Sequence, residues 1–321
     1  MRKVNFGKNF IPKFVATLIA ALLLPCLFFL FTFSGQKSAY AATEPEQTYN
    51  ITSADDFVAY SRAYAAGDRN PKDVLNISIS SGNEISDARY ISLGTQSRPF
   101  AGKLIISTGG IDTFRLYNCP LFDYVSAEMI VGGSGVVKII RERAAETPAA
   151  GVLTQGALFA NHVVGGASAA SWNVSFLPYS GEGNSAADYG GVIGEIAANA
   201  SVSVNYNNTS NLPVSGSGST GLICGTLGAG ATLSVSTGGS GSAISVSSTG
   251  GNAGGLVGTM DSGATLNFAT ANNSRVNSVN SGAGYAGGIV GSAVDPVITF
   301  GAGEYAVNGT VSGKTGAGGL F

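Results

Sequence analysis

Histidine, cysteine and charged side chains are all scarce in this chain. Among its 321 residues there are one histidine and three cysteines, and only 11% of the residues are charged. The lone histidine, His162, is the only candidate base for a serine nucleophile, and we interpret it instead as a residue of a turn or of a ladder edge. Cysteine and histidine never gather at the spacing of metal ligands. The sequence therefore predicts no catalytic residue, no cofactor and no metal site.

The N-terminal segment, 1–41, has the features of an export signal. Four basic residues precede an apolar run from Phe14 to Phe33, and Ala39-Tyr40-Ala41 forms a small-residue cleavage pattern. This predicts a signal peptide over residues 1–41, although about 20 apolar residues are also long enough for an uncleaved anchor. Cleavage leaves 12 basic and 19 acidic side chains, a net charge near −7, and no membrane span. That charge disfavours nucleic acid and anionic membranes as partners.

One segment has a clear helical pattern, over residues 53–68. Ser53 and Asp56 form a capping box at its start, and three aromatic residues recur behind them at helical spacing. A polar leader, residues 42–50, precedes this helix. Runs of β type follow it, so residues 51–125 are interpreted as an N-terminal cap and lead-in region to repeats over residues 126–321.

The glycine-rich remainder of the chain is periodic. A glycine followed by an aliphatic pair recurs at a nearly constant interval, at Gly191, Gly221, Gly255, Gly288 and Gly319. A flexible Gly/Ser linker has no reason to keep such a period, which is typical of solenoid repeats. Each period holds three short runs of β type. The pattern predicts an all-β, right-handed parallel β-helix with about 30–35 residues per coil.

The glycines and the aliphatic residues are expected at different places in each predicted coil. We expect the glycines at corners where the backbone has positive φ, and the aliphatics in columns that point inward. The predicted columns are Leu222, Leu256, Ile289 and Leu320, and Leu233 with Leu266. Cys119 and Cys224 would lie about three coils, or roughly 14 Å, apart. A disulfide needs Cα atoms within about 7 Å, so no bridge between them is expected.

The repeated "GGLVG" (254–258) and "GGIVG" (287–291) resemble the GLUG-type repeat of bacterial surface β-helix proteins. In addition, "ITSADDFVAYSRA" (51–63) is similar to the first helix of those proteins, and "YISLGTQSRPFAGKLIIS" (90–107) to the segment leading into their helix core. The resemblance covers about Ile51 to Phe321. It implies an exported, surface-displayed β-helix of the adhesin type, and it carries over no catalytic residue.

Several short patterns suggest a chemistry that their surroundings do not support. "GSGSTG" (216–221) has the spacing of a dinucleotide loop, but a strand-like run follows it instead of a helix. "GTVSGKT" (309–315) is one residue short of a phosphate loop. The pair Asp55-Asp56 lies at a helix start, where carboxylates act as caps, and Arg141-Glu142-Arg143 is interpreted as solvated surface.

Two functions stay open at this level. The preferred hypothesis is a secreted or cell-surface structural and adhesive module that binds an unidentified glycan or protein ligand without turnover. The alternative is a polysaccharide lyase or glycoside hydrolase, for which acids from neighbouring coils would have to converge. The sequence stops at "TGAGGLF", two residues into an aliphatic pair, so we expect further coils beyond Phe321. An open last coil would favour self-association.

Overall fold

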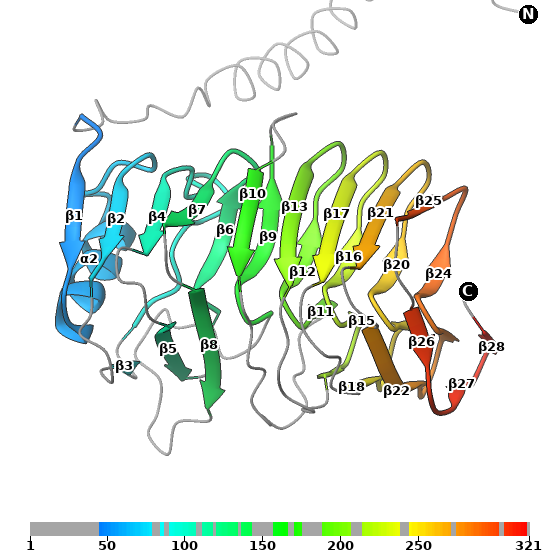
Figure 1. Ribbon diagram of the computed structural model, residues 1–321. Coiled ribbons are helices and arrows are strands. Elements are labelled where there is room, and N and C mark those ends of the chain that lie inside the picture. Colours follow the sequence, from blue (N-terminus) through cyan, green and yellow to red (C-terminus); the bar gives the residue numbers. More distant parts are fainter. Residues whose placement is uncertain are drawn as a thin grey trace, which may run out of the picture. The chain divides into compact units, whose positions relative to one another are not determined.

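Short apolar runs that recur with the period of the repeat fold into strands, and each strand lies beside its counterpart one coil away. The computed structural model shows a parallel β-solenoid built in this way (Figure 1). It describes residues 45–78, 84–86, 90–106, 111–117, 120–133, 136–142, 157–165, 170–174, 188–206, 214–237, 244–270, 274–301 and 305–319.

Sheet 1 is the longest of four parallel sheets. The strands on its main path are, in order, β1 (Thr48–Ile51), β2 (Val74–Ile77), β4 (Lys103–Ile106), β7 (Ile130–Gly133), β10 (Ala170–Val174), β13 (Ser201–Tyr206), β17 (Thr232–Thr237), β21 (Thr265–Thr270) and β25 (Val297–Phe300). Three further strands join it where β8 pairs with β10; these are β3 (Glu84–Ser86), β5 (Ile111–Tyr117) and β8 (Val136–Glu142).

Three shorter sheets complete the coils. Sheet 2 contains β6 (Phe122–Ser126), β9 (Ala160–Val164), β12 (Ile193–Ile196), β16 (Cys224–Leu227), β20 (Val257–Met260) and β24 (Val290–Ala293). Sheet 3 contains β14 (Val214–Gly216), β18 (Ile244–Ser248), β22 (Ser274–Ser281), β26 (Tyr305–Val307) and β27 (Val311–Gly313). Sheet 4 contains β11 (Asp188–Gly190), β15 (Ser219–Gly221), β19 (Ala253–Gly254), β23 (Tyr285–Gly287) and β28 (Gly316–Gly318).

One coil visits the four sheets in a fixed order. From β12 in sheet 2 the chain passes to β13 in sheet 1, β14 in sheet 3 and β15 in sheet 4, and β16 then pairs in parallel with β12. In sheet 2, Ile193 pairs with Cys224, Cys224 with Val257, and Val257 with Val290, so successive coils are nearly equal in length. The predicted parallel β-helix and its period are both confirmed.

The coils that begin at β12, β16 and β20 have four strands each, whereas three were predicted. The fourth is the glycine-rich segment itself, such as β19, whose Gly254 pairs with Gly221 and Gly287 in the neighbouring coils. Glycine has a low intrinsic preference for strands, so the sequence pattern assigned these residues to a turn. The ladder hydrogen bonds of sheet 4 order them as strands.

The repeated glycines are required by close packing of backbones, and the prediction that they have positive φ is wrong. Sheet 4 and sheet 2 meet at a two-residue corner, and a Cβ on Gly254 would overlap the carbonyl oxygen of Val257 and lie 2.6 Å from the backbone nitrogen of Gly291. A Cβ on Gly258 would lie 2.7 Å from the carbonyl oxygen of Gly225. The "GGLVG" motif therefore marks places where only a hydrogen atom fits between strands.

A recurrent left-handed corner does exist, but between sheet 2 and sheet 1. Asn199, Gly230, Gly263 and Asp295 each lie two residues before a strand of sheet 1, with φ of 61°, 65°, 69° and 45°. Glycine, asparagine and aspartate are the residues that tolerate this conformation best. The expected stacking of positive-φ corners is thus confirmed at this corner.

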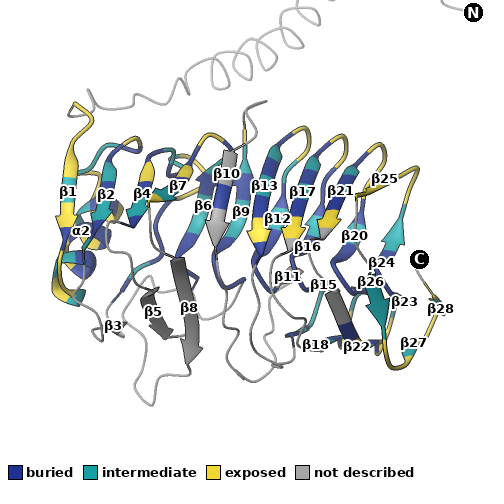
Figure 2. Cartoon of the chain, viewed as in Figure 1, coloured by how far each residue is buried: buried dark blue, intermediate teal, exposed yellow. Residues whose placement is uncertain are grey.

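Buried residues recur from strand to strand along the solenoid (Figure 2), and nearly all of those in the core are apolar. Leu222, Leu256 and Ile289 are buried, and Leu233 pairs with Leu266, which is buried as well. The column of Leu233 and Leu266 is confirmed, and so is the stacking of Leu256 on Ile289. The place of Leu222 in that column is wrong: Cys224 pairs with Val257, so the counterpart of Leu256 is Ile223, and Leu222 aligns with Gly255. Leu320 lies outside the described residues, as does Cys119. Cys224 is buried in the core, and the absence of a bridge between the two cysteines stays a prediction.

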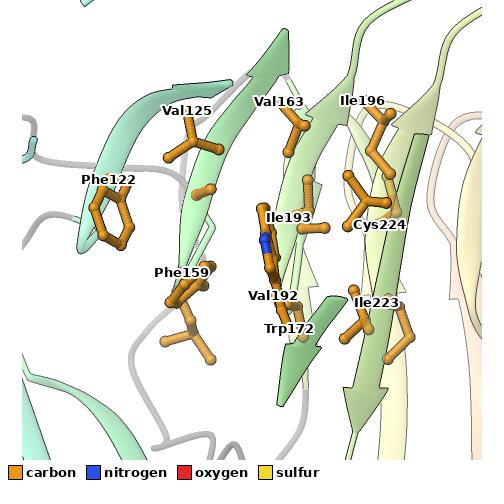
Figure 3. Packing of buried hydrophobic residues seen from close by; sticks show 14 of the residues in the cluster. Phe122, Val125, Phe159, Val163, Trp172, Val192, Ile193, Ile196, Ile223 and Cys224 are labelled. Carbon is orange, nitrogen blue, oxygen red and sulfur yellow. The ribbon is translucent and has the colours of Figure 1, made fainter. Parts of the chain in front are cut away.

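The core is aromatic toward the N-terminal end. Tyr64, Phe100, Phe122, Phe159 and Trp172 contact one another in succession, with ring centroids 5.0–5.9 Å apart. Figure 3 shows the last three of these rings followed by aliphatic side chains of the next coils. Ring pairs of this kind contribute about 0.5–1.5 kcal/mol each beyond their burial, so these coils are bound together more tightly than burial alone provides.

Helix α2 (Ala54–Ala66) packs against the first coils at this end (Figure 1). Ser53 caps it by accepting a hydrogen bond from the Asp56 backbone N–H, 3.2 Å away, and the left-handed Gly67 ends it. The predicted aromatic face is buried, and Tyr64 begins the aromatic row described above. The predicted helix is confirmed, shorter by one residue at its start and by two at its end.

The inward assignment of the aliphatic column predicts the effect of a charge placed on it. Leu256→Asp should lower the free energy of unfolding by about 3 kcal/mol or more, because it buries a carboxylate without a partner. Ser262→Asp, at an exposed corner position, should change it by no more than about 0.5 kcal/mol. Urea unfolding of both variants measures the difference, and equal losses would contradict the assignment.

The two roles of glycine predict unequal costs for the same substitution. Gly263→Ala should cost about 1–2 kcal/mol, because φ there is positive while no atom lies within 4 Å of the added Cβ. Gly258→Ala should cost more, since its Cβ overlaps the backbone nitrogen of Thr220 and the coil must open to admit it. Thermal unfolding of the two variants gives the order, and a smaller cost at Gly258 would refute the close-packing role.

Candidate functional site

The outward positions of the strands carry small polar side chains in register. In sheet 1, one such column consists of Ser203, Ser234, Asn267 and Thr299. The Asn267 side chain donates a hydrogen bond to Ser234 Oγ, 3.3 Å away. The column lines a groove with a cavity volume of about 330 Å³. In sheet 3, Ser247 donates to Ser215 one coil away, at 3.1 Å.

In sheet 2 the corresponding outward column has large or charged side chains in its first three coils and small hydroxyl side chains in the next three. From β6 to β24 it consists of Tyr124, His162, Glu195, Thr226, Thr259 and Ser292. Tyr124, His162 and Glu195 point away from the core, because the residues that follow them, Val125, Val163 and Ile196, are buried in it (Figure 3). Three successive coils thus place a phenol, an imidazole and a carboxylate side by side.

These three side chains and two neighbours, Asp123 and Asn161, form what we call the His162 cluster. His162 Nδ1 lies 3.0 Å from Glu195 Oε2. On its other side the imidazole stacks on the Tyr124 ring, with centroids 4.3 Å apart and an interplanar angle of 18°. Asn161 donates a hydrogen bond to Asp123 Oδ1, 3.1 Å away. The side-chain oxygen of Asn161, Oδ1, accepts a hydrogen bond from the Ala157 backbone N–H, so both ends of the side-chain amide are held in place.

The two carboxyl groups of the cluster are perturbed in opposite directions. The hydrogen bond from His162 lowers the pKa of Glu195 below its ordinary value, against a smaller opposing effect of burial. Burial raises the pKa of Asp123, and the hydrogen bond from Asn161 and the charge of His162 only partly offset it. Burial, with the charges of Asp123 and Glu195, also raises the pKa of Tyr124. The site therefore favours positive charge close to Asp123.

The structure places His162 differently from the sequence-based interpretation. It lies in the middle of β9, outward-facing and paired, and not in a turn or at a ladder edge. Strand pairing brings it together with Tyr124 in the coil before and Glu195 in the coil after. Both partners are separated from it in the sequence by close to one repeat period. A continuation of the repeat count through its weaker early copies would therefore have found the cluster.

The other patterns lie where the sequence suggested. "GSGSTG" covers the end of β14 and all of β15, and strand β16 follows it, so the dinucleotide context is missing. Asp56 caps α2 and accepts from the Thr52 backbone N–H, 2.9 Å away. Arg143 lies outside the described residues. Over the described part of the chain, no group of three or more His, Cys, Asp or Glu residues is placed to hold a metal ion.

In comparisons with known proteins, no family model, no curated protein and no solved structure matches this chain. Within the described residues, none of the helical structure is long and apolar enough to cross a bilayer. The apolar run from Phe14 to Phe33 lies outside those residues.

The ion pair predicts how acidity changes the stability of a Glu195→Gln variant. A carboxyl whose folded-state pKa is lowered from its ordinary value of 4.5 stabilises the fold above that pH, and this contribution disappears as the pH falls through the lowered value. The variant should therefore be less stable than the parent at pH 7, by about 0.5–1 kcal/mol for a half-exposed pair. Urea unfolding should show this difference shrinking as the pH falls below 4.5.

Asp123→Asn provides the matched control, with the opposite sign. The pKa of Asp123 is raised from its ordinary value of 3.8, so its carboxylate is disfavoured in the fold. The asparagine variant should gain stability relative to the parent as the pH rises from about 3 to 7. Identical pH slopes for both variants would contradict the arrangement described for the cluster.

Proposed function

We propose that this chain is a structural and adhesive β-helix module, exported and displayed at a bacterial cell surface, which binds a glycan or protein ligand without turnover. The observation that carries the proposal is the register of its outward side chains. Serine, threonine and asparagine repeat at equivalent positions from coil to coil, as in the sheet 1 column. A regular row of hydroxyl and amide groups suits multivalent hydrogen bonding to a repetitive ligand.

Export and display are supported by the sequence. The basic, apolar and small-residue order of residues 1–41 is that of a signal peptide. The "GGLVG" repeats resemble those of GLUG-type surface proteins, and the solenoid has the fold that this resemblance implies. The acidic balance of the chain after residue 41 favours neutral or cationic ligands over nucleic acid.

Binding without turnover is tested by two assays on the same ligands. The purified chain is applied to an array of glycans and matrix proteins, and each retained ligand is then incubated with the chain in solution and analysed for products. We expect retention with the ligand recovered intact. Failure to retain any ligand would overturn the adhesive role.

A carbohydrate-active enzyme is the second candidate, and one observation favours it. Asp123 and Glu195 interact with the same imidazole, and their surroundings shift the two carboxyl pKa values in opposite directions. A pair of this kind can divide the roles of general acid and general base. New reducing ends or unsaturated sugars, formed by the parent chain and not by Glu195→Gln, would establish this candidate and displace the first.

Self-association through the C-terminal coil is a further part of the proposal. β25 is the last described strand of sheet 1 and pairs only with β21. Val294, Val297 and Phe300 on this coil are 56%, 52% and 49% exposed. Their counterparts one coil earlier include the buried Phe268, which pairs with Phe300. Exposed apolar side chains that lie together in this way favour contact with a further surface, such as that of a second copy.

This surface predicts a concentration-dependent change in mass. Sedimentation velocity should show the parent chain associating as its concentration rises. The double variant Val297→Ser, Phe300→Ser should associate less, because the contact loses its apolar area. Ile130→Ser, which changes an exposed apolar residue on β7 instead, is the control and should behave as the parent does. A parent that stays monomeric at all concentrations would refute the contact.

A further inference from the structure

We propose that the His162 cluster binds the protonated amino group of an amino sugar within an extended, deacetylated hexosamine glycan. The proposal rests on the proposed function and names the class of glycan. The cluster lies where the strands of sheet 2 depart from the residue pattern of the later coils.

The later coils define what the repeat requires at this position. In the later strands of sheet 2 the two middle residues are Gly225-Thr226, Gly258-Thr259 and Gly291-Ser292. In the earlier coils the same two positions are Asp123-Tyr124, Asn161-His162 and Gly194-Glu195. Small residues suffice to build the ladder, so folding does not explain the phenol, the imidazole and the two carboxyls. All of these large or charged residues lie together on three adjacent coils.

The covering of sheet 2 changes at the same place. Sheet 4 packs closely against the glycines of sheet 2 in the later coils, as the contact between Gly258 and Thr220 shows. Among the described residues, the strand order of sheet 4 begins with β11, beside β12. Asn161 and Asp123 occupy the positions that glycine holds in the later coils. His162 and Glu195 have 34% and 39% of their side chains exposed, so a ligand can contact both.

The charge of the cluster selects the ligand group. When both carboxyl groups are ionised, one imidazole can neutralise at most one of them, so the cluster keeps a net negative charge. Burial makes the ionised form of the Asp123 carboxyl unfavourable. A cation bound beside it would offset this cost. A protonated amine bound beside His162 supplies that cation and can donate a charge-assisted hydrogen bond to a carboxylate.

The surroundings of the amine site favour a sugar. The Tyr124–His162 stack offers ring edges and a phenol hydroxyl, and the Asn161 amide is held in place by its two hydrogen bonds. Thr226, Thr259 and Ser292 continue the column with hydroxyl groups, one per coil, at a spacing of about 4.8 Å. An extended hexosamine chain lying along the solenoid axis would present roughly one sugar to each coil.

The test compares two polymers that differ only in their charge. Isothermal titration calorimetry is carried out on the full chain with a glucosamine hexamer and with the N-acetylglucosamine hexamer. The deacetylated hexamer should bind at least about tenfold more tightly, because only it carries the amines that hydrogen-bond to charged partners. Glu195→Gln and Asp123→Asn should each weaken it by about tenfold. Asp261→Asn, an exposed acid at a corner of another coil, should leave the affinity unchanged.

Each outcome decides the proposal. Equal affinity for the two hexamers, or no effect of Glu195→Gln and Asp123→Asn, overturns it while the adhesive function stands on other retained ligands. Binding of hexalysine but not of the glucosamine hexamer assigns the cluster to a basic peptide and also overturns it. Loss of affinity in the Asp261→Asn control indicates attraction by net charge alone and contradicts a defined site. An array that retains no ligand overturns the adhesive function itself.

Discussion

In-register parallel pairing between one coil and the next is the constraint on which the whole structure depends. Each strand donates and accepts its ladder hydrogen bonds with the equivalent residues one period away. Once that register is fixed, a side chain in one coil has its counterpart directly beside it in the next. Aliphatic residues then form continuous inner columns, hydroxyl residues form continuous outer columns, and glycines recur wherever backbones touch. The core, the surface and the corners are therefore consequences of a single repeat length.

The same register makes the His162 cluster. Residues about one period apart in the sequence become neighbours because they occupy one position in three coils. A solenoid can assemble such a group by substituting two positions per coil, without a loop or a second domain. The remaining contacts of those coils, including the buried valines and Ile196, follow the ordinary pattern. The scaffold and the site are thus almost independent, which is why chemistry can be placed on it without disturbing the core.

The architecture was largely predictable from the sequence, because periodicity and alternation act over many residues. The period, the inner columns of Leu256 and Leu266 and the α2 helix all follow from local pattern. The fourth strand was missed because "AG" has no strand propensity and is ordered only by its ladder partners. The reason for the repeated glycines was also missed, because backbone proximity between coils has no local signature. His162 was misplaced for a related reason: the early copies of the repeat are weak, and the strand positions of the later coils were not carried back through them.

The uneven distribution of aromatic residues has a consequence for how the chain acquires its structure. The row from Tyr64 to Trp172 and the helix beside it lie in the part of the chain that is synthesised first. These coils combine a large apolar core with a helix that covers their end, so they can become ordered before the glycine-rich coils exist. Each later coil has little side-chain area to bury, and its many glycines lose much backbone entropy on folding. Such a coil becomes ordered by pairing with the edge of a coil that has already formed. The solenoid would then fold coil by coil in one direction, from the aromatic N-terminal coils toward the C-terminal coils.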